Sequence, residues 1–458
     1  MSKPFYITTP IYYPNAAPHV GTAYTTIICD VVARYKRLTG KEVGFMTGVD
    51  EHGQKIQEAA EKNGFTPQQW VDKMSLNFTT LWEKLNISNT DFLRTTQERH
   101  LKTVREIIKR VHDKGDIYRG EYVGKYSVSE ETFVPENQLV DGKYMGKEVI
   151  DVKETSYFFK LSKYENALLE HIEKNPDFIK PEGKKNEVIA FIKQGLQDLS
   201  ISRTTFDWGI PLELEEGHII YVWFDALNVY LTGAEFSTDT EQFDKFWTNG
   251  TVNHVVGKDI LRFHAIIWPA ILMSAGIKLP DTIAAHGWWT VEGEKMSKSL
   301  GNVVNPEEEV KKYGLDAFRY YLMREATFGQ DADYSKKAMV QRINADLANE
   351  LTHNLVLLLA PFVPHITEEL WHELGETESV HTMNWPTYEE SALEVDEVEV
   401  VLQVNGKVRD KLTVSVNITK EELEALAKES SRVQEFTEGK QIVKVIYVPG
   451  KLVNIVVK

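Results

Sequence analysis

The stretch FYITTPIYYPNAAPHVGT, residues 5–22, decides the fold of this chain. Its first five residues are an apolar and threonine-rich run that predicts a buried strand. Beyond Pro18, apolar residues recur on one face of a helix that ends at Gly40. His19 and Gly21 therefore lie in a strand-to-helix turn, where backbone N–H groups and the helix dipole favour an anion. Taken alone, the same residues also fit an ordinary tight turn.

A second stretch, GEKMSKSLGN at residues 293–302, carries two lysines three residues apart. Lys295 and Lys298 flank Ser297, and a glycine lies on each side of the group. Lysine is a mobile point charge and glycine supplies a hinge, so such a loop can close over a polyphosphate. The alternative is a solvated basic turn.

Strand-like and helix-like segments alternate between these two stretches. Strands are predicted at 43–47, 92–94, 252–256 and 282–285, with a buried parallel strand in the apolar run 218–225 and helices at 66 onward, 96–115 and 260–273. Polar residues follow the strand at 43–47, and the carboxyl ends of parallel strands are where open sheets bind ligands. The alternation predicts an α/β fold with a Rossmann-like parallel sheet.

The remaining segments indicate further parts of the chain. A mixed segment interrupts the alternation as a connective insertion, and after the lysine loop come a short α-helical region and a small C-terminal α+β domain with a turn at Asn405–Gly406. The predicted domains are 1–116 and 211–300 for the two halves of the catalytic sheet, 117–210 for the insertion, 301–385 for the helical region and 396–458 for the C-terminal domain.

Composition limits the class of protein. The chain has 458 residues, a formal net charge of -16 and a single cysteine, Cys29. One cysteine excludes an internal disulfide framework and a cysteine-based zinc knuckle, so no structural zinc is expected. The absence of a long apolar run and of a signal peptide favours a cytoplasmic protein. A tRNA partner would need a local basic stripe on this acidic body.

The paired stretches resemble the two signatures of class I aminoacyl-tRNA synthetases. Residues 1–351 resemble the methionyl-tRNA synthetases through YITTPIYYPN at 6–15, TGVDEHG at 47–53, LQDLSISR at 196–203, YVWFDAL at 221–227 and KMSKS at 295–299. The tail, about 352–458, resembles instead the C-terminal part of leucyl-tRNA synthetases, through LLLAPFVPHITEELW at 357–371, VNGKVRDK at 404–411 and VPGKLVNIV at 448–456. Much of the helical anticodon bundle expected between the two parts is missing.

The resemblance implies roles around ATP. The catalytic positions are His19, Thr22, Lys295 and Lys298, and the ATP-binding positions are His19, Gly21, Gly257, Asp259, Lys295, Ser297 and Lys298. Thr22 stands where the family has a second histidine, which implies either a tolerated variant or slower activation. Asp259 also fits a simple helix cap. Mg²⁺ is expected with ATP.

The resemblance also implies a methionine site. Asp50 matches the carboxylate that holds the substrate ammonium group, and the side-chain pocket matches Ile11, Tyr13, Trp223, Ala226, Tyr230, Ile260 and His264. An apolar, aromatic slot suits a thioether. Trp223 and Ile260 fit equally well as core residues.

For tRNA, the candidate contacts are Arg319, Arg324, Lys407 and Arg409. With Lys411, the last two alternate along one predicted strand and are expected to share a face, either as a phosphate stripe or as edge-strand protection. The implied function is an ATP-dependent methionine–tRNA ligase, with a monomer favoured. Two alternatives stay open: an adenylate-forming enzyme that charges tRNA poorly, and a non-catalytic tRNA- or protein-binding relative.

Overall fold

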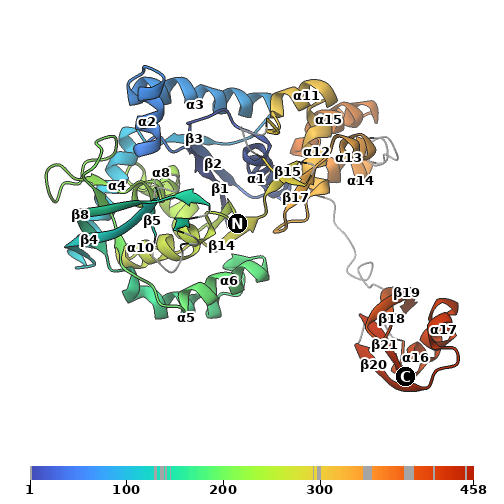
Figure 1. Ribbon diagram of the computed structural model, residues 1–458. Helices are drawn as coiled ribbons and strands as arrows, with labels where there is room; N and C mark the ends of the chain where they lie inside the picture. Colours follow the sequence, from blue (N-terminus) through green and yellow to red (C-terminus); the bar gives the residue numbers. More distant parts are fainter. Residues whose placement is uncertain are drawn as a thin grey trace. The chain divides into compact units, whose positions relative to one another are not determined.

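The computed structural model describes residues 3–127, 132–134, 139, 142–144, 146–291, 293–296, 301–343, 353–385, 397–415, 418–448 and 451–458. The chain forms two compact units, Met1–Trp385 and Pro386–Lys458. Figure 1 shows the first unit in blue to orange and the second in red.

A six-stranded sheet organises the first unit, in the order β3-β2-β1-β13-β14-β9. Its strands are β1 (Phe5–Tyr12), β2 (Val43–Val49), β3 (Asp91–Arg94), β9 (Ile179–Lys180), β13 (Thr251–Gly257) and β14 (Thr282–His286). Every pairing in it is parallel, and β1 lies between β2 and β13. The predicted α/β fold with a Rossmann-like parallel sheet is confirmed.

Helices cover both faces of this sheet (Figure 1). They include α1 (Val20–Leu38), α2 (Gln54–Lys62), α3 (Pro67–Lys84), α4 (Glu98–Asp113), α8 (Val229–Gly233) and α10 (Trp268–Ala275). Because side chains alternate along a strand, Tyr6 packs with α4 and α10 residues, whereas Phe5 and Ile7 pack with α1. The two cores hold β1 in the middle of a three-layer structure.

An antiparallel sheet follows α4 in the chain. It has the order β10-β8-β4-β5, and its main strands are β4 (Ile117–Ser127) and β8 (Ile150–Phe159), with β5 (Thr132–Val134) and β10 (Leu199–Ser200) at its edges. Two helices of the same segment are α5 (Glu165–Lys174) and α6 (Glu182–Ile192). Between them β9 pairs with β14, so this segment also supplies an edge of the main sheet.

The apolar run 218–225 is not a parallel strand, and that prediction is wrong. Only β12 (Ile219–Ile220) is extended, and it pairs antiparallel with β11 (Ser202–Arg203). The run continues as the short helix α7 (Val222–Ala226). A short apolar run fits a buried strand and a buried helix equally well, and here the helix is favoured.

The predicted helix 260–273 contains a change of pitch. Its middle, Phe263–Ile267, is π-helical (η4), and α10 begins at Trp268. Pro269 therefore stands in the first turn of α10, where its missing N–H costs nothing. Single π turns are frequent at functional sites, and this one carries His264.

The lysine stretch leads into the helical region. A three-stranded sheet, β16-β15-β17, contains β15 (Trp289–Val291), β16 (Glu294–Lys295) and β17 (Ala332–Tyr334). The helices that follow are α11 (Pro306–Tyr313), α12 (Leu315–Glu325), α13 (Lys336–Arg342), α14 (His353–Leu359) and α15 (Pro364–Glu373). Residues 344–352 of the predicted helical region 301–385 lie outside the described residues.

The second unit is a four-stranded sheet with two helices. The strands β18 (Glu397–Val404), β19 (Lys407–Ser415), β20 (Ile442–Val448) and β21 (Leu452–Val457) have the order β19-β18-β21-β20, and α16 (Lys420–Glu429) and α17 (Ser431–Thr437) pack on it. Asn405 and Gly406 both have positive φ, as a tight hairpin turn requires. The predicted α+β fold is confirmed for the described residues of this unit.

Candidate active site

The nucleotide end of the candidate site begins at the first residues of α1. His19 is the N-cap of this helix, and its Nδ1 accepts a hydrogen bond from the Gly21 N–H at 3.1 Å. Because Nδ1 of a neutral ring accepts this bond, its proton lies on Nε2. His19 is exposed, and its ring lies at the positive end of the helix.

Gly21 is required by the histidine beside it. A Cβ on Gly21 would lie 3.0 Å from Cε1 of His19, closer than ordinary contact. The glycine thus allows the imidazole to fold back over the helix end, a steric role that was not predicted. Thr22 is buried, and its carbonyl accepts a bond from the Tyr12 hydroxyl at 3.4 Å.

Both ends of the lysine loop contact the same helix. On the entering side, Trp289 packs edge-on against Tyr24 of α1, with ring centroids 5.5 Å apart. On the leaving side, the Val20 N–H donates to the Val304 carbonyl at 3.1 Å. The described residues therefore bring the loop's base to the helix end that carries His19. Lys295 belongs to β16 by its backbone, and Ser297 and Lys298 lie outside the described residues.

A turn after β13 completes this end. A Cβ on Gly257 would lie 2.4 Å from Oδ1 of Asp259, so any larger residue would have to displace the Asp259 carboxylate. Asp259 Oδ1 also accepts a bond from the Trp288 indole N–H at 3.3 Å. Lys258 lies 4.1 Å from the centroid of a Trp288 ring and 2.6 Å from Asp331. Gly257 and Asp259 are thus adjacent to the base of the lysine loop.

The amino-acid end begins where β2 ends. The Asp50 N–H donates to the Tyr12 carbonyl at 2.9 Å. In the next residue, Glu51, the carboxylate accepts from Arg94 at 2.6 Å and the backbone N–H donates to the Thr95 hydroxyl at 2.9 Å. Asp50 is 4% exposed. A carboxylate held at the carboxyl end of a central strand suits a bound ammonium group.

Aromatic side chains from α7, α8 and η4 lie together at this end. Trp223 stacks on Phe263 at 3.7 Å with rings 10° apart, and meets His264 edge-on at 6.4 Å. The Tyr230 hydroxyl lies 2.6 Å from Nε2 of His264. Trp223 and Ile260 are half-buried, which leaves part of each side chain accessible.

The hydrogen bonds of His264 fix its tautomer. Nδ1 lies 2.9 Å from the Ile260 carbonyl, which only accepts, so the ring proton is on Nδ1. Nε2 then accepts a hydrogen bond from the Tyr230 hydroxyl. Burial lowers the pKa of His264 to about 4 and raises the pKa of Tyr230 well above its usual value. Both groups are therefore neutral at pH 7.

Asp50 influences the aromatic cluster electrostatically. After burial, the groups that raise the pKa of Tyr230 include Tyr12 and Asp50, which places that carboxylate within electrostatic range of the hydroxyl. Ile11 packs against the same core as Trp223, Ala226 is buried on α7, and the Tyr13 ring lies 4.8 Å from Nζ of Lys55. The printed contacts thus bring together Trp223, Tyr230 and His264 from α7, α8 and η4. The contacts of Ile11, Tyr13 and Ala226 do not by themselves place them in the same pocket, and their role stays a prediction.

Sequence reasoning missed the buried groups that support these side chains. His254 lies under Tyr230, with ring centroids 4.1 Å apart, and its Nδ1 is 2.8 Å from the Thr8 hydroxyl. His286 lies 2.7 Å from the Thr25 hydroxyl in α1. Burial lowers the pKa of both histidines. In the sequence, only the place of His286 at the end of β14 gave a signal; His254 lies in the middle of β13.

The prediction that Arg319 contacts tRNA is wrong. Its side chain is fully buried and pairs with Asp30 at 2.5 Å, and it also donates to the Leu85 carbonyl at 3.0 Å. The spacing of a charged residue along a helix does not reveal whether its charge is paired in the protein interior. The Arg319–Asp30 pair is buried, and it joins α12 to α1. Arg324, one and a half turns later, is exposed.

The expected stripe of Lys407, Arg409 and Lys411 is also wrong. A register shift between Leu402 and Gln403 breaks the alternation of β19. Lys407 then pairs with Val404 and Lys411 with Val401, so they lie on opposite faces. The Arg409 guanidinium lies 3.6 Å from the centroid of the Phe436 ring.

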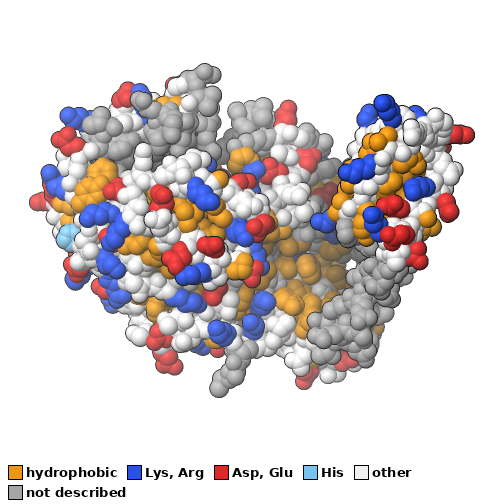
Figure 2. Space-filling view, turned by 90° about the horizontal axis from the view of Figure 1, so that it is seen from below, with side chains coloured by type: hydrophobic (Ala, Val, Ile, Leu, Met, Phe, Trp, Pro, Cys, Tyr) orange, Lys and Arg blue, Asp and Glu red, His pale blue; other side chains and the backbone are white. Residues whose placement is uncertain are grey.

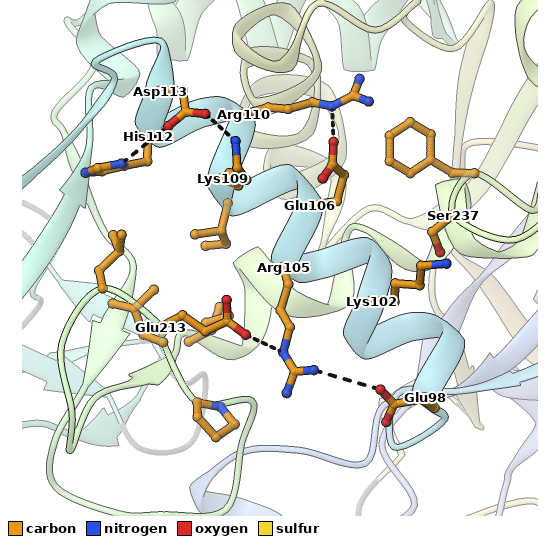
Figure 3. A pocket seen from close by; sticks show the side chains of 16 residues that line it. Glu98, Lys102, Arg105, Glu106, Lys109, Arg110, His112, Asp113, Glu213 and Ser237 are labelled. Atoms are coloured by element: carbon orange, nitrogen blue, oxygen red, sulfur yellow. Dashed lines mark hydrogen bonds and ion pairs between the residues drawn. The ribbon is translucent and has the colours of Figure 1, made fainter.

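A groove of about 740 Å³ runs along α4 (Figure 3). Its walls are charged, and the charges bind one another. Arg105 pairs with Glu213 at 3.1 Å, Lys109 with Asp113 at 2.7 Å and Arg110 with Glu106 at 2.8 Å. No predicted site residue lines it, so we assign the site to the strand ends.

The surface does not present a single charged stripe on the face that Figure 2 shows, where Lys and Arg are interspersed with Asp and Glu. Within the described residues, no three His, Cys, Asp or Glu side chains are arranged to hold a metal ion. No helix in that part of the chain is long and apolar enough to cross a bilayer.

Known proteins share this sequence and fold. The family model for tRNA synthetases class I (M) matches residues 5–148 and 142–357, and that for the anticodon-binding domain of tRNA ligases matches 315–425. A methionine–tRNA ligase of Fusobacterium nucleatum is 62% identical over 354 residues, which cover 77% of this chain and 56% of that protein. One of Rickettsia bellii is 48% identical over 386 residues, or 82% of this chain and 75% of that protein.

A solved structure agrees with these relatives. The Mycobacterium tuberculosis methionyl-tRNA synthetase in complex with methionyl-adenylate has a TM-score of 0.74 and 49% identity, and covers 78% of this chain and 72% of that chain. The chain spans only 56% of the F. nucleatum relative. The matches nevertheless extend over most of this sequence, and the chain belongs to the methionyl branch of the class I aminoacyl-tRNA synthetases.

Proposed function

We propose that this chain activates methionine with ATP and transfers the methionyl group to tRNA. The observation that carries the proposal is a buried carboxylate, Asp50, at the end of β2, which acts electrostatically on Tyr230 in a neutral aromatic cluster that also includes Trp223. A carboxylate beside an apolar slot matches an α-amino acid with an uncharged, polarisable side chain.

The methionine would bind with its ammonium group at Asp50 and its thioether in the pocket. Ile11, Tyr13, Ala226, Ile260 and His264 complete the proposed walls. The Tyr230 hydroxyl donates its hydrogen bond to His264 and is therefore not available to the substrate. The pocket then offers the sulfur mainly polarisable aromatic ring faces. An apolar pocket rejects smaller side chains only modestly. The distance between the fixed ammonium group and the pocket therefore has to determine which side-chain length fits.

At the other end, activation joins the methionine carboxylate to the α-phosphate and expels pyrophosphate. Negative charge develops on phosphoryl oxygens, so placed donors do more than a covalent nucleophile. His19 is supported as such a donor by its Nε2 proton and its place at a helix N-terminus. We assign Gly21, Gly257 and Asp259 to the nucleoside side of ATP.

Lys295, Ser297 and Lys298 are proposed to hold the departing pyrophosphate. The contacts of Trp289 and Val304 with α1, which bring the loop's base near His19, support this assignment. Thr22 supplies no charge where the family has a histidine, so we expect slower activation than in a relative with both. Mg²⁺ is expected to arrive on ATP; the described residues offer it no ready ligand set, and no step is assigned to it.

The tRNA assignment rests on the helical region and the second unit. The match of residues 315–425 to an anticodon-binding domain supports a tRNA partner. Exposed Arg324 and Lys407 are proposed as phosphate contacts, and Arg409 as a support for the surface beside Phe436. We propose the cytoplasm as the location, because charged tRNA is used there in protein synthesis.

Methionine-dependent exchange of pyrophosphate into ATP, measured beside leucine, tests the activation step. Exchange with methionine and little with leucine is expected, whereas exchange with neither refutes the proposal. Charging of methionine tRNA beside leucine tRNA tests transfer. Strong exchange with poor charging would favour the second function, an adenylate-forming enzyme that charges tRNA weakly.

A further inference from the structure

A buried carboxylate joins three segments behind the amino-acid end of the site. Oδ2 of Asp225 lies 2.7 Å from Nδ1 of His52, and Oδ1 lies 2.7 Å from Nε2 of His100. Asp225 and His100 are fully buried, and His52 is 6% exposed. None of the three belongs to the proposed binding pocket, and one of them comes from α4 on the flank of the sheet.

Further bonds fix each member of this cluster. Nδ1 of His100 lies 3.0 Å from the Thr232 hydroxyl in α8. The Asp225 N–H donates to the Tyr221 carbonyl at 3.0 Å, and the Asn228 amide donates to the Phe224 carbonyl at 2.6 Å. Burial alone would raise the pKa of Asp225, but His52 and His100 outweigh it and lower the pKa. The carboxylate is therefore ionised and doubly bonded.

The cluster spans the two parts of the proposed methionine site. His52 follows Asp50 by two residues, and Asp225 stands between Trp223 and Ala226 on α7. The residues before His52 are bonded elsewhere: Asp50 to Tyr12 at the end of β1, and Glu51 to Arg94 at the end of β3. The His52–Asp225 bond is thus a direct tie between the ammonium-binding loop and the helix that forms the thioether wall.

We propose that Asp225 is a positioning residue that sets the distance between Asp50 and the thioether pocket, acting through His52 with His100 as its buried anchor. The inference rests on the proposed function, since it concerns how that site measures methionine. Loss of the tie should loosen recognition of the amino acid while ATP binding is kept, because the contacts at His19 and Gly257 do not involve the cluster.

The two histidines allow a test with opposite expectations. Asparagine places its amide near Nδ1 of a histidine and glutamine places it near Nε2. At position 52 the bond uses Nδ1, so His52→Asn keeps the donor to Asp225 and His52→Gln loses it. At position 100 the bond uses Nε2, so His100→Gln keeps it and His100→Asn loses it.

We expect His52→Gln, His100→Asn and Asp225→Asn to raise the KM for methionine roughly tenfold to a hundredfold in pyrophosphate exchange, with the KM for ATP within about twofold. His52→Asn and His100→Gln should stay within about threefold of wild type. Discrimination between methionine and ethionine should fall in the first group only. Equilibrium methionine binding is measured on the same variants as a second readout.

Asp116→Asn is the matched control. Asp116 is also buried, and it binds Lys163 at 2.5 Å and the Ser274 hydroxyl at 2.8 Å, but none of its partners is a proposed site residue. It should lower the Tm without changing the KM for methionine. If Asp225→Asn does not fold, the comparison of His100→Gln with His100→Asn still tests the inference.

Three results overturn the inference. The first is equal damage from Asn and Gln at position 100, and the second is a parallel rise of both KM values. The third is an effect on Tm alone, as expected for the control. If the wild type binds methionine but shows no pyrophosphate exchange, the proposed function is refuted. Methionine binding by the variants then still tests whether the His52–Asp225 bond positions the site. A wild type that does neither overturns both.

Discussion

The two ends of the proposed site are built by different means. At the amino-acid end, side chains of α7, α8 and η4 contact one another, as in the buried Tyr230–His264 pair at 2.6 Å. At the nucleotide end, an exposed histidine caps a helix and a loop approaches it through backbone and ring contacts. The first end is preorganised for a fixed shape, and the second is suited to charge that develops and leaves.

This difference implies that substitutions at the two ends have different kinetic signatures. Changes at the amino-acid end should act on methionine affinity, because the groups there are already in place before reaction. Changes at the nucleotide end should act on the rate of adenylate formation, because donors there matter most when pyrophosphate departs.

The largest expected effect is that of Asp50→Ala. Removing one partner of a buried charge pair costs about 3–4 kcal/mol, which weakens methionine binding roughly a hundredfold to a thousandfold. Isothermal titration with methionine measures it, and ATP affinity serves as the control. Unchanged methionine affinity would contradict the ammonium role.

Lys298→Ala should show the opposite signature. Loss of one donor to a developing charge costs about 3 kcal/mol, so adenylate formation slows roughly a hundredfold while methionine affinity stays the same. Single-turnover kinetics separate the two quantities. Lys312→Ala, an exposed lysine on α11, is the control and should change neither. Equal loss of rate and affinity would remove the distinction between the ends.

Acid should destabilise the amino-acid end. Burial lowers the pKa of His264 to about 4, whereas the unfolded chain binds this proton near pH 6.5. Between these values the unfolded state holds more protons, so stability falls as pH falls, by about 2 kcal/mol at pH 5 from this group. Urea unfolding at pH 7 and pH 5 measures it.

The control for this prediction is His264→Asn, which removes the group that binds the proton. The difference in unfolding free energy between pH 7 and pH 5 should shrink by about 2 kcal/mol in that variant. His254 and His286, whose pKa values are also lowered, account for part of the remaining slope. An unchanged slope would show that His264 is not buried in its neutral form.

The smallest expected effect is that of Tyr230→Phe. It leaves Nε2 of His264 without its donor, at a cost of about 1–2 kcal/mol in unfolding free energy. Tyr118→Phe, which removes an exposed hydroxyl bound to Asp198, should stay within about 0.5 kcal/mol. Urea midpoints compare the two. Equal losses of unfolding free energy in the two variants would mean that the buried Tyr230–His264 bond contributes no more to stability than the exposed Tyr118–Asp198 bond.

The sequence predicted what local pattern determines. The strand–turn–helix at residues 5–38 and the helix that begins after Thr66 follow from apolar spacing and helix-start signals, and the structure has them. The run 218–225 failed because apolarity alone does not choose between a strand and a helix, and tertiary packing favoured α7.

The sequence could not predict partnerships between distant side chains. Arg319 carries a charge at a spacing typical of a surface helix, yet Asp30, far away in the chain, holds it inside. The bulge in β19 that separates Lys407 from Lys411 has no clear mark in the residues either. The roles assigned to the site residues stay predictions, because geometry alone does not show which atoms meet substrate.

The most direct test of the two-ended site is a crystal structure with a non-hydrolysable methionyl-adenylate analogue. One bound molecule should place its amino group within roughly 3.2 Å of the Asp50 carboxylate, its thioether between Trp223 and Tyr230, and its phosphate mimic beside Nε2 of His19. An analogue that bound with its amino group away from Asp50, or with its phosphate mimic away from the start of α1, would contradict the account.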